Sequence, residues 1–383
     1  MSPAGGLPHD DLGDAWRAAR LQPAAVHLDH AACSRQSTAV LDSVARHARH
    51  EAELGGYVAE QAADGLLQQG RSVLAGLVGM AAADVAFTES ASASVRTLVS
   101  RWRLAPGARV GVLPGEYWQN VAAFTAAGLT PVVLPADAVG RADLAGVERA
   151  LRDDPPAFVH LTLVASHRGV VQPGREVADL CRAAGVPLVL DVAQALGHVD
   201  CDLGADAAYG TSRKWLAGPR GVGFLVLRPA VSAQLSPLVG PELYDEDRTG
   251  VDHARWYESH EAHVAGRVGL VVALGEHLAA GPHRVRERLA ALGRATRERL
   301  DGRAGWQVAE PLDEPTALTT LRPPPDVDVR QVVTRLRTEH GVLTTEAGRE
   351  RAPGELTGPV LRVSPHLDAT VDQLDLLATA LAP

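Results

Sequence analysis

The sequence predicts an α/β fold: a large domain with a mostly parallel β-sheet between layers of helices, then a smaller C-terminal α+β domain. Between residues 109 and 227, short and almost wholly apolar strands alternate with helices, which is typical of a parallel sheet buried on both faces. After residue 283 the alternation gives way to charged helices and isolated strands. The 383 residues also exceed one ordinary core. We expect an N-terminal segment near the small domain (1–25), a large domain (26–262), and a linker helix with the small domain (263–383).

The first elements lead into the large domain. We expect a short helix around residues 14–21, and within residues 26–34 a short strand that opens into a loop. The helical period of the apolar residues predicts a helix over 37–63 and a second over 65–78.

The first strand and the loop after it carry His27, His30 and Cys33 at three-residue spacing. These side chains could be read as metal ligands. Strand alternation, however, puts neighbouring positions on opposite faces, and no fourth ligand is nearby. A loop that lines a pocket is the favoured interpretation, and we expect no metal site.

A run of small and hydroxyl residues, 88–94, follows a short strand at 85–87 and precedes a helix that starts near Val95. Free backbone N–H groups at a helix N-terminus favour a phosphate or another anion. The alternative is a serine-rich N-cap without a ligand.

From residue 109 the strands are marked by apolar runs and the helices by their polar faces. The predicted strands are 110–113, 132–134, 158–163, 187–191 and 224–227, and the predicted helices are 120–127, 143–152 and 175–184. Ligands of such sheets lie beyond the carboxyl ends of the strands. The polar residues expected at that edge are Ser90, Ser92, Glu116, Tyr117, Trp118, Ser166, His167, Asp191 and Gln194.

The remaining elements form the linker and the smaller domain. A loop at 344–358 contains no cysteine. The predicted helices are 263–278, 283–300, 329–340 and 371–381, and the predicted strands are 306–308, 317–321 and 360–363.

Composition narrows the class of protein. A net charge of −9 argues against a nucleic-acid partner. Cys33, Cys181 and Cys201 form no CxxC pair, so neither a disulfide framework nor a zinc knuckle is indicated. The N-terminus lacks the features of a signal peptide, and no apolar window is long enough to span a membrane. A cytoplasmic location without membrane contact is therefore expected.

Lys214 is the only lysine among 37 lysine and arginine residues. Arginine solvates a surface as well as lysine does, but its guanidinium stays protonated and cannot supply a neutral amine for an imine. Lys214 is therefore a candidate Schiff-base nucleophile. A leftover surface lysine is the competing interpretation.

The residues around Lys214 in the chain favour the first interpretation. Asp191 ends an apolar strand 23 residues earlier and could pair with a protonated pyridine nitrogen, although it could also cap the following helix. Gln194 lies one helical turn further on. Thr211 and Arg213 flank Lys214 and could bind phosphate. Tyr117 or Trp118 offers an aromatic face for stacking, or else packs in the core. Together these features describe a pyridoxal phosphate site.

The segments that carry these residues resemble the class V aminotransferase and cysteine desulfurase family. The matching segments are 87–92, 116–117, 169–173, 191–198, 204–206, 211–219, 221–224 and 361–366, so the resemblance covers nearly the whole chain. It implies the fold-type-I architecture with a seven-stranded type of sheet, pyridoxal phosphate as cofactor, and a homodimer with active sites at the interface.

The resemblance also implies roles for single residues. Lys214 would bind the cofactor covalently, Asp191 would pair with the pyridine nitrogen, and Gln194 would contact the ring hydroxyl. Arg362 would bind the substrate carboxylate, with His30 and Cys33 as further substrate-binding candidates. The phosphate would be held by Ser90, Ala91, Ser92, Thr211 and Arg213, with Tyr117 stacked on the ring and Ser166 beside it.

Three departures from the family pattern matter. Ser166 stands where many relatives have asparagine. His260-Glu261 stands where relatives lend a Gly-Thr pair to the phosphate across the dimer, so either that loop is placed differently or Arg267 compensates the charge. The loop 344–358 lacks the mobile cysteine that desulfurases need, so sulfur transfer to the protein is not expected.

Within the family, the segments 28–37, 165–169 and 211–214 resemble the C–S lyases of ergothioneine biosynthesis. This predicts a C–S β-lyase acting on a small amino-acid substrate, hercynylcysteine sulfoxide, that releases a sulfur product, pyruvate and ammonia. A cysteine desulfurase, a selenocysteine lyase, and a class V aminotransferase or epimerase are the alternative enzymes. A regulatory protein that binds the cofactor would also need a basic helix-turn-helix module, and the chain has no room for one. A plain scaffold protein would bind no pyridoxal phosphate, so the purified protein would lack the yellow colour of that cofactor.

Overall fold

The large domain is built on a seven-stranded sheet with the strand order β2-β8-β7-β6-β5-β3-β4. The computed structural model describes residues 7–236, 253–259 and 261–382. Within the sheet only β8 runs antiparallel to its neighbours, which confirms the predicted mostly parallel α/β architecture. Its strands are β2 (Val85–Thr88), β3 (Arg109–Val112), β4 (Thr130–Val133), β5 (Phe158–Thr162), β6 (Leu188–Asp191), β7 (Ala207–Thr211) and β8 (Gly223–Leu227).

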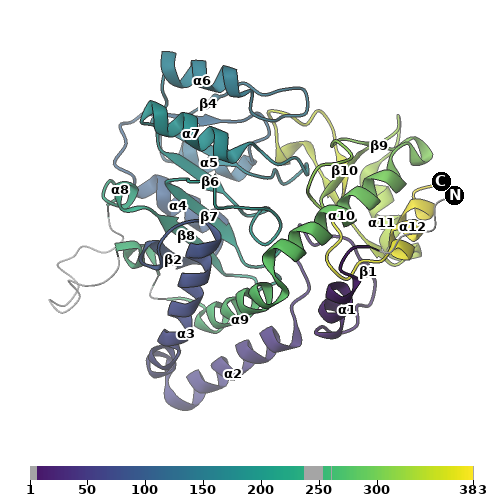
Figure 1. Ribbon diagram of the computed structural model, residues 1–383, viewed down its shortest axis with the longest axis horizontal. Helices are drawn as coiled ribbons and strands as arrows, with labels where there is room; N and C mark the ends of the chain where they lie inside the picture. The colour runs from purple at the N-terminus through teal and green to yellow at the C-terminus, as the bar shows by residue number, and fades with distance from the viewer. Residues whose placement is uncertain (1–6, 237–252, 260, 383) are drawn as a thin grey trace.

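Helices cover both faces of this sheet (Figure 1). One apolar cluster joins a sheet face to α3, α6, α7 and α9, and a second joins the opposite face to α4 and α5. The large-domain helices are α2 (Thr38–Leu54), α3 (Gly56–Leu77), α4 (Ala91–Arg101), α5 (Trp118–Ala126), α6 (Leu144–Asp153), α7 (Gly174–Ala184), α8 (Pro229–Ser232) and α9 (Val264–Ala280), with short 3-10 turns at η1 (Ala82–Asp84) and η4 (His253–Tyr257).

The small domain is an antiparallel sheet of order β12-β13-β10-β9 with helices packed against it. A separate parallel pair joins β1 to β11. The elements are α1 (Asp10–Ala18), β1 (Val26–His27), α10 (Pro282–Leu300), η5 (Arg303–Gly305), β9 (Gln307–Val308), β10 (Thr319–Arg322), α11 (Val329–Glu339), β11 (Val342–Leu343), β12 (Thr345–Ala347), η6 (Arg349–Arg351), β13 (Val360–Val363) and α12 (Val371–Ala380).

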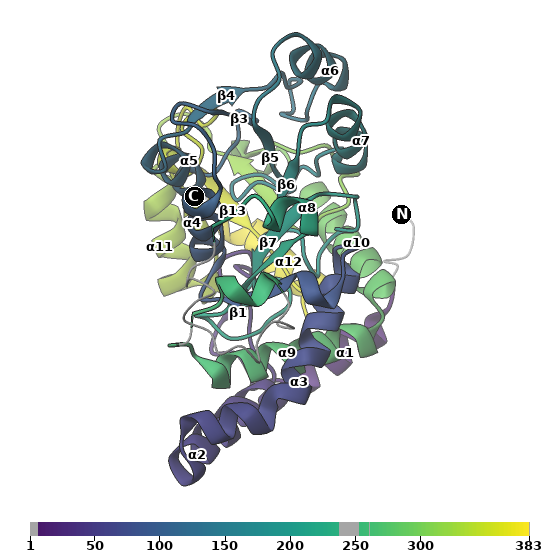
Figure 2. The same cartoon turned by 90° about the vertical axis from the view of Figure 1, so that its left-hand side faces the viewer.

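The division at residues 25 and 262 remains a prediction, and the packing beside each boundary is now visible. Strand β1 pairs with β11 of the small domain, and α1 shares an apolar cluster with α10. Helix α9, expected to act as a linker, contributes buried side chains to the large-domain core and packs on α2 and α3. Figure 2 shows α9 running beside α3, with α2 extending away from the sheet.

Two local predictions were wrong. The expected helix over 37–63 breaks at Gly55, where φ is +87°, so α2 ends at Leu54 and α3 begins at Gly56. A positive φ strains residues with a side chain, and glycine adopts it freely. Strand β7 was not predicted at all, because Ala-Ala-Tyr-Gly-Thr is poor in strand-forming residues, and its place between β6 and β8 comes from tertiary pairing.

No single helix in the described residues is both long and apolar enough to cross a membrane. Among the helices that the structure describes, only α9 and α10 taken together meet that length and composition, and they are bent by 83° at their junction.

Four buried histidines tie the stability of the fold to pH. Burial lowers the pKa of His198 to about 3 and that of His277 to about 4, and it holds the pKa values of His30 and His366 well below their ordinary range. Below pH 6.5 these imidazoles therefore bind protons in the unfolded chain but stay neutral in the folded protein. We expect the free energy of unfolding to fall between pH 7 and pH 5, by roughly 2 kcal/mol at pH 5 for each of His198 and His277, and His30 and His366 add a loss of the same sign.

Denaturant unfolding at pH 7 and pH 5 measures this loss. His277→Gln is expected to reduce the pH dependence by the contribution of one histidine, whereas the exposed His50 changed to Gln is a matched control that should leave it intact. His160, whose pKa is raised by Glu116, acts in the opposite direction and offsets part of the effect. Equal unfolding free energies at the two pH values would contradict the prediction.

Candidate active site

A cavity of about 340 Å³ lies at the carboxyl ends of the large-domain strands. The N-terminal loop contributes Ala31 and Ala32, and the small domain contributes Arg351. All ten residues predicted to bind the cofactor line this cavity: Ser90, Ala91, Ser92, Tyr117, Ser166, Asp191, Gln194, Thr211, Arg213 and Lys214. The fold thus brings together residues that are up to 124 positions apart in the chain, because parallel strands end at one edge of the sheet.

Lys214 lies just beyond β7 in a turn closed by the bond from Ala217 N to Lys214 O. Desolvation, followed by the charge of Arg213, lowers the pKa of Lys214 to about 7. The neutral amine that imine chemistry requires is thus well populated near pH 7. The next residue, Trp215, fixes the turn, since its ring stacks on His198 at 3.7 Å and its Nε1 donates to Gln194 Oε1 at 2.9 Å.

Asp191 is a buried carboxylate held by three donors. Its Oδ2 accepts from Asn120 Nδ2 at 3.1 Å and from the Tyr209 hydroxyl at 3.2 Å, while Oδ1 accepts from Ala193 N at 2.8 Å. The last bond closes a local turn, and since residues 192–206 form no helix, the alternative that Asp191 caps a helix is wrong. The bond from Ala193 N does not prevent the carboxylate from pairing with a pyridine nitrogen.

Asp191 is connected through the Tyr209 hydroxyl to a buried pair, Glu116 and His160, that the sequence did not predict. Glu116 Oε2 contacts His160 Nδ1 at 2.8 Å, and His160 Nε2 contacts the Tyr209 hydroxyl at 2.8 Å. Burial alone would raise the pKa of Glu116, but His160 and hydrogen bonds from Asn120 and Thr162 hold it below its ordinary value. Burial would likewise lower the pKa of His160, yet Glu116 raises it. The available signal was a histidine inside an otherwise apolar strand.

Gln194 spans the N-terminal loop and the lysine turn. Its Nε2 donates to Ala31 O at 2.9 Å, and its Oε1 accepts from Trp215. Its contact with a ring hydroxyl therefore stays a prediction.

The phosphate candidates surround the N-terminus of α4. Ser90 Oγ accepts from Ala93 N at 3.0 Å as the N-cap, and Ser92 Oγ donates to Gln119 at 2.7 Å. A side chain at Gly223 would lie 2.6 Å from the Ser90 backbone, so only glycine lets β8 approach this loop. Hydroxyls, helix N–H groups and the Arg213 guanidinium fit a phosphate, while Lys214 and Asp191 fit an aldehyde and a pyridine nitrogen. The residues present fit pyridoxal phosphate.

The three substrate-binding candidates do not line the cavity. His30 is fully buried, with Nδ1 3.0 Å from Ser34 Oγ, and its ring packs near Trp16 and His366. Cys33 is a partly exposed free thiol. Arg362 is buried, donating from Nη1 to Ser166 O at 2.9 Å and from Nη2 to Asp29 Oδ1 at 3.0 Å. Their substrate contacts stay predictions.

Two departures from the family pattern can be placed. Ser166 lines the cavity with a buried Oγ that has no partner among the described residues. Arg267 pairs with Glu258 at 3.3 Å, and no ion pair joins it to Glu261 in the described part of the chain. Residue 260 lies outside the described residues.

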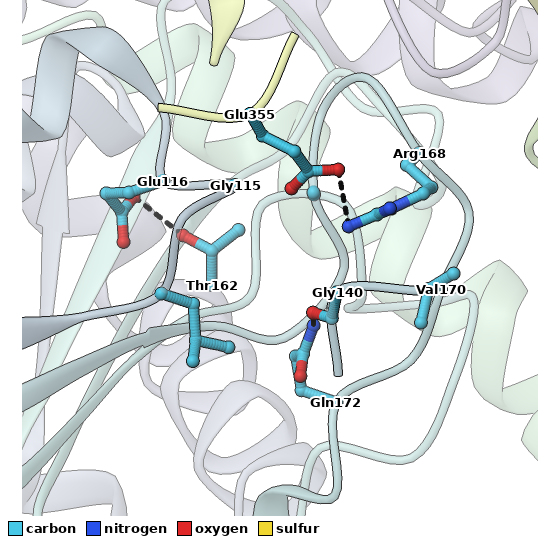
Figure 3. A pocket seen from close by; sticks show the side chains of 10 residues that line it. Gly115, Glu116, Gly140, Thr162, Arg168, Val170, Gln172 and Glu355 are labelled. Carbon is cyan, nitrogen blue, oxygen red and sulfur yellow. Dashed lines mark hydrogen bonds and ion pairs between the residues drawn. The ribbon is translucent and has the colours of Figure 1, made fainter. Parts of the chain in front are cut away.

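The cysteine-free loop packs against the large domain through Glu355. Its Oε1 lies 2.5 Å from Arg168 Nη2 and 3.3 Å from His167 Nε2. Figure 3 shows Glu355 pointing from the small domain toward Arg168. A side chain at Gly115 would lie 2.5 Å from Glu355 Oε2, and one at Gly354 would lie 2.8 Å from a backbone oxygen of the large domain. These two glycines permit the close approach.

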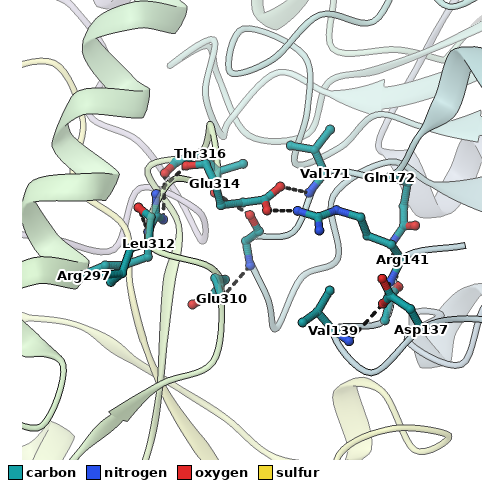
Figure 4. Close-up of polar contacts among 12 residues, drawn as sticks. Asp137, Val139, Arg141, Val171, Gln172, Arg297, Glu310, Leu312, Glu314 and Thr316 are labelled. Atoms are coloured by element: carbon teal, nitrogen blue, oxygen red, sulfur yellow. Dashed lines mark hydrogen bonds and ion pairs between the residues drawn. The ribbon is translucent and has the colours of Figure 1, made fainter.

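A second contact from the small domain holds the segment 166–171 that borders the cavity. Glu310 Oε1 accepts from Gly169 N at 2.9 Å, and Glu314 Oε1 accepts from Val171 N at 2.8 Å. Thr320 Oγ1 donates to the backbone oxygen of His167 at 2.7 Å. Figure 4 shows Glu314 between Val171 and Arg141, and Arg141 forms an ion pair with Glu314. The small domain therefore fixes the backbone that carries Ser166.

Comparison with known proteins adds to this geometry. A family model described as aminotransferase class-V matches residues 26–377. A probable hercynylcysteine sulfoxide lyase of Mycobacterium tuberculosis is 49% identical over 99% of this chain and 94% of its own length. An isopenicillin N epimerase of Amycolatopsis lactamdurans is 30% identical over 97% of this chain and 98% of its own.

Solved structures share the fold at lower identity. A cysteine desulfurase from Thermococcus onnurineus superimposes with a TM-score of 0.85 at 19% identity, over 99% of this chain and 98% of that one. The cysteine desulfurase CsdA of Escherichia coli gives 0.83 at 21% identity, over 96% and 97%.

Proposed function

The chain belongs to the class V aminotransferase family, and we propose that it is a pyridoxal phosphate-dependent C–S β-lyase that cleaves hercynylcysteine sulfoxide. The observation that carries the enzyme class is the cavity itself, where Lys214, with a pKa lowered to about 7, shares one space with the buried carboxylate of Asp191. The relative named as a probable hercynylcysteine sulfoxide lyase supports the choice of substrate, since it matches nearly the whole chain at 49% identity.

The reaction follows from what these side chains can do. When bound, pyridoxal phosphate supplies an aldehyde that condenses with amines and a ring that accepts the electrons of a carbanion. Asp191 Oδ2 would hold the proton at the ring nitrogen, helped by the donors that fix its position. Lys214 Nζ would first be joined to the cofactor and, once released by the substrate amine, take the proton from the substrate Cα.

Loss of the Cα proton then expels the sulfur group. The Cβ–S bond breaks with its electron pair leaving on sulfur as a sulfenate, which becomes a sulfenic acid on protonation. The three-carbon fragment takes up one water and ends as pyruvate and ammonia. No oxidant or reductant is consumed, so the sulfoxide oxygen stays with the sulfur product.

The desulfurase alternative lacks its nucleophile. Desulfurases need a mobile cysteine in the C-terminal loop, and residues 344–358 contain none. Cys181 and Cys201 are buried in the apolar core, where burial raises the pKa of the Cys181 thiol to about 12 and also raises the pKa of the Cys201 thiol, so neither can serve as a substitute. Thiolate attack on the substrate sulfur is therefore not expected from these two residues.

Product analysis tests the proposed function. Purified holoenzyme incubated with hercynylcysteine sulfoxide is expected to release pyruvate and ammonia in equal amounts, without added keto acid. Alanine with protein-bound sulfur would identify a desulfurase and overturn the proposal. An inverted amino-acid stereocentre would identify an epimerase, and stoichiometric consumption of a keto acid would identify an aminotransferase.

We further propose that the enzyme acts as a cytoplasmic homodimer on a small amino-acid substrate, with active sites at the subunit interface and without a nucleic-acid or membrane partner. Exposed apolar side chains at the α2–α3 break support a covered surface there, since Tyr57 is 89% exposed beside Leu54 and Val58. Light scattering is expected to give twice the chain mass of 40.3 kDa. A monomer with full activity would contradict this proposal.

A further inference from the structure

The charges that line the cavity leave one arginine without an assigned anion. Lys214, Arg213 and Arg351 are the cationic residues of the lining, and Asp191 is its carboxylate. The cofactor phosphate matches Arg213, and the cofactor aldehyde matches Lys214. Arg351 has no ion-pair partner among the described residues. A cation that faces a ligand cavity without a partner is suited to an anionic group of the ligand.

Arg351 and Arg362 are not equivalent. Arg362 is buried, and Asp29 and the Ser166 carbonyl occupy both its terminal nitrogens, which leaves only its Nε without a partner. The resemblance to the class V family assigns the α-carboxylate to Arg362, whose Nε is a buried donor without a partner in the described residues. Arg351 comes from a separate loop and lines the cavity itself, so it is the cation left for a second anion of the substrate.

Arg351 reaches the cavity from an anchored position. It ends the turn η6, four residues before Glu355, which contacts Arg168 and His167 of the large domain (Figure 3). Between them Ala352 is fully buried, and its carbonyl accepts from the backbone N–H groups of Glu355 and Leu356. A guanidinium on such a support loses less conformational entropy when it binds a ligand than one on a free loop.

We propose that Arg351 determines substrate specificity by binding the second carboxylate of the substrate, the one that leaves with the sulfur. This inference rests on the proposed function, because hercynylcysteine sulfoxide carries one carboxylate on its cysteine side and another on its trimethylhistidine side. A guanidinium can meet that carboxylate with two parallel hydrogen bonds, which also fixes the orientation of the departing half. The loop that provides a nucleophile in desulfurases would here provide a specificity contact.

The test compares two substrates and two matched variants of the holoenzyme. Arg351→Ala removes the proposed contact. Arg349→Ala removes an exposed arginine from the same turn that does not line the cavity. Hercynylcysteine sulfoxide presents both carboxylates, whereas S-methylcysteine sulfoxide presents only the α-carboxylate. Arg351→Ala is expected to raise KM for the first substrate by roughly 10- to 100-fold, with kcat nearly unchanged, and to alter kcat/KM for the second by less than about threefold. Arg349→Ala is expected to change neither.

A binding measurement on the cofactor-free protein provides a readout separate from turnover. Calorimetry with the trimethylhistidine betaine is expected to show a Kd that rises at least about tenfold in Arg351→Ala, partly recovers in Arg351→Lys, and stays constant in Arg349→Ala. Equal losses on both substrates would show that Arg351 serves the α-carboxylate or the loop fold, and would overturn the inference, as would an unchanged betaine Kd. If the unaltered enzyme forms no pyruvate from either substrate, the proposed function itself fails, and this inference fails with it.

Discussion

Lys214→Ala is expected to lower the rate of pyruvate formation by about 10⁴-fold or more, which is the largest effect of any single substitution in this chain. The change removes the amine that binds the cofactor and the base that takes the Cα proton. No other residue can take over, because the chain has no second lysine and arginine stays protonated. Lys214→Arg keeps the positive charge and most of the volume, so it serves as a matched control for the amine and should be equally inactive.

Borohydride reduction followed by peptide mass analysis locates the bond to the cofactor. Because the chain has one lysine, a single pyridoxyl-modified peptide containing Lys214 is expected from the unaltered protein, and none from either variant. A Lys214→Ala protein that keeps more than about a tenth of the activity would refute the assignment of the base, since such a loss is far below the usual effect of removing a catalytic base.

Asp191→Asn is expected to lower kcat by roughly 10²- to 10³-fold while leaving most of the cavity intact. An amide of the same shape cannot hold the proton at the pyridine nitrogen by charge. The NH₂ group of the new amide also replaces an oxygen that accepts hydrogen bonds. It would face another donor, either Ala193 N or the donors of Asn120 and Tyr209. The affinity for the cofactor should fall as well, which fluorescence titration of the cofactor-free protein measures.

Tyr209→Phe is the matched control for Asp191→Asn. It removes one hydrogen bond to Oδ2 but keeps the carboxylate and its bond from Asn120. We expect less than about a tenfold loss of kcat, because the carboxylate keeps its charge and the hydrogen bonds from Asn120 and Ala193. If Tyr209→Phe were as damaging as Asp191→Asn, the hydrogen-bonded network and not the charge would be the important feature of this site.

The sequence predicted the fold class and the cofactor because both depend on local patterns. Apolar strands alternate with helices, and the motif residues from Ser90 to Lys214 stand at strand ends that a parallel sheet must bring together. A local sequence pattern does not show which strands become neighbours in the sheet. The contacts of His160 with Glu116 and with Tyr209 were therefore missed. The position of Arg351 at the cavity was missed for the same reason, because its loop reaches the cavity only after the two domains pack.

Hydrogen exchange at two backbone amides can report whether the two domains separate. These amides lie in the segment 166–171 and donate to glutamates of the small domain. Gly169 N and Val171 N donate to Glu310 and Glu314, which belong to the other domain, so their hydrogens can exchange with solvent only when the domains part. Amides inside a single domain, such as Val189 N in the central strand β6, exchange only when that domain unfolds. The ratio of the exchange rates of Gly169 and Val171 to the intrinsic rates of unprotected amides gives the free energy of opening one domain from the other, and its change on adding substrate would show whether turnover requires that opening.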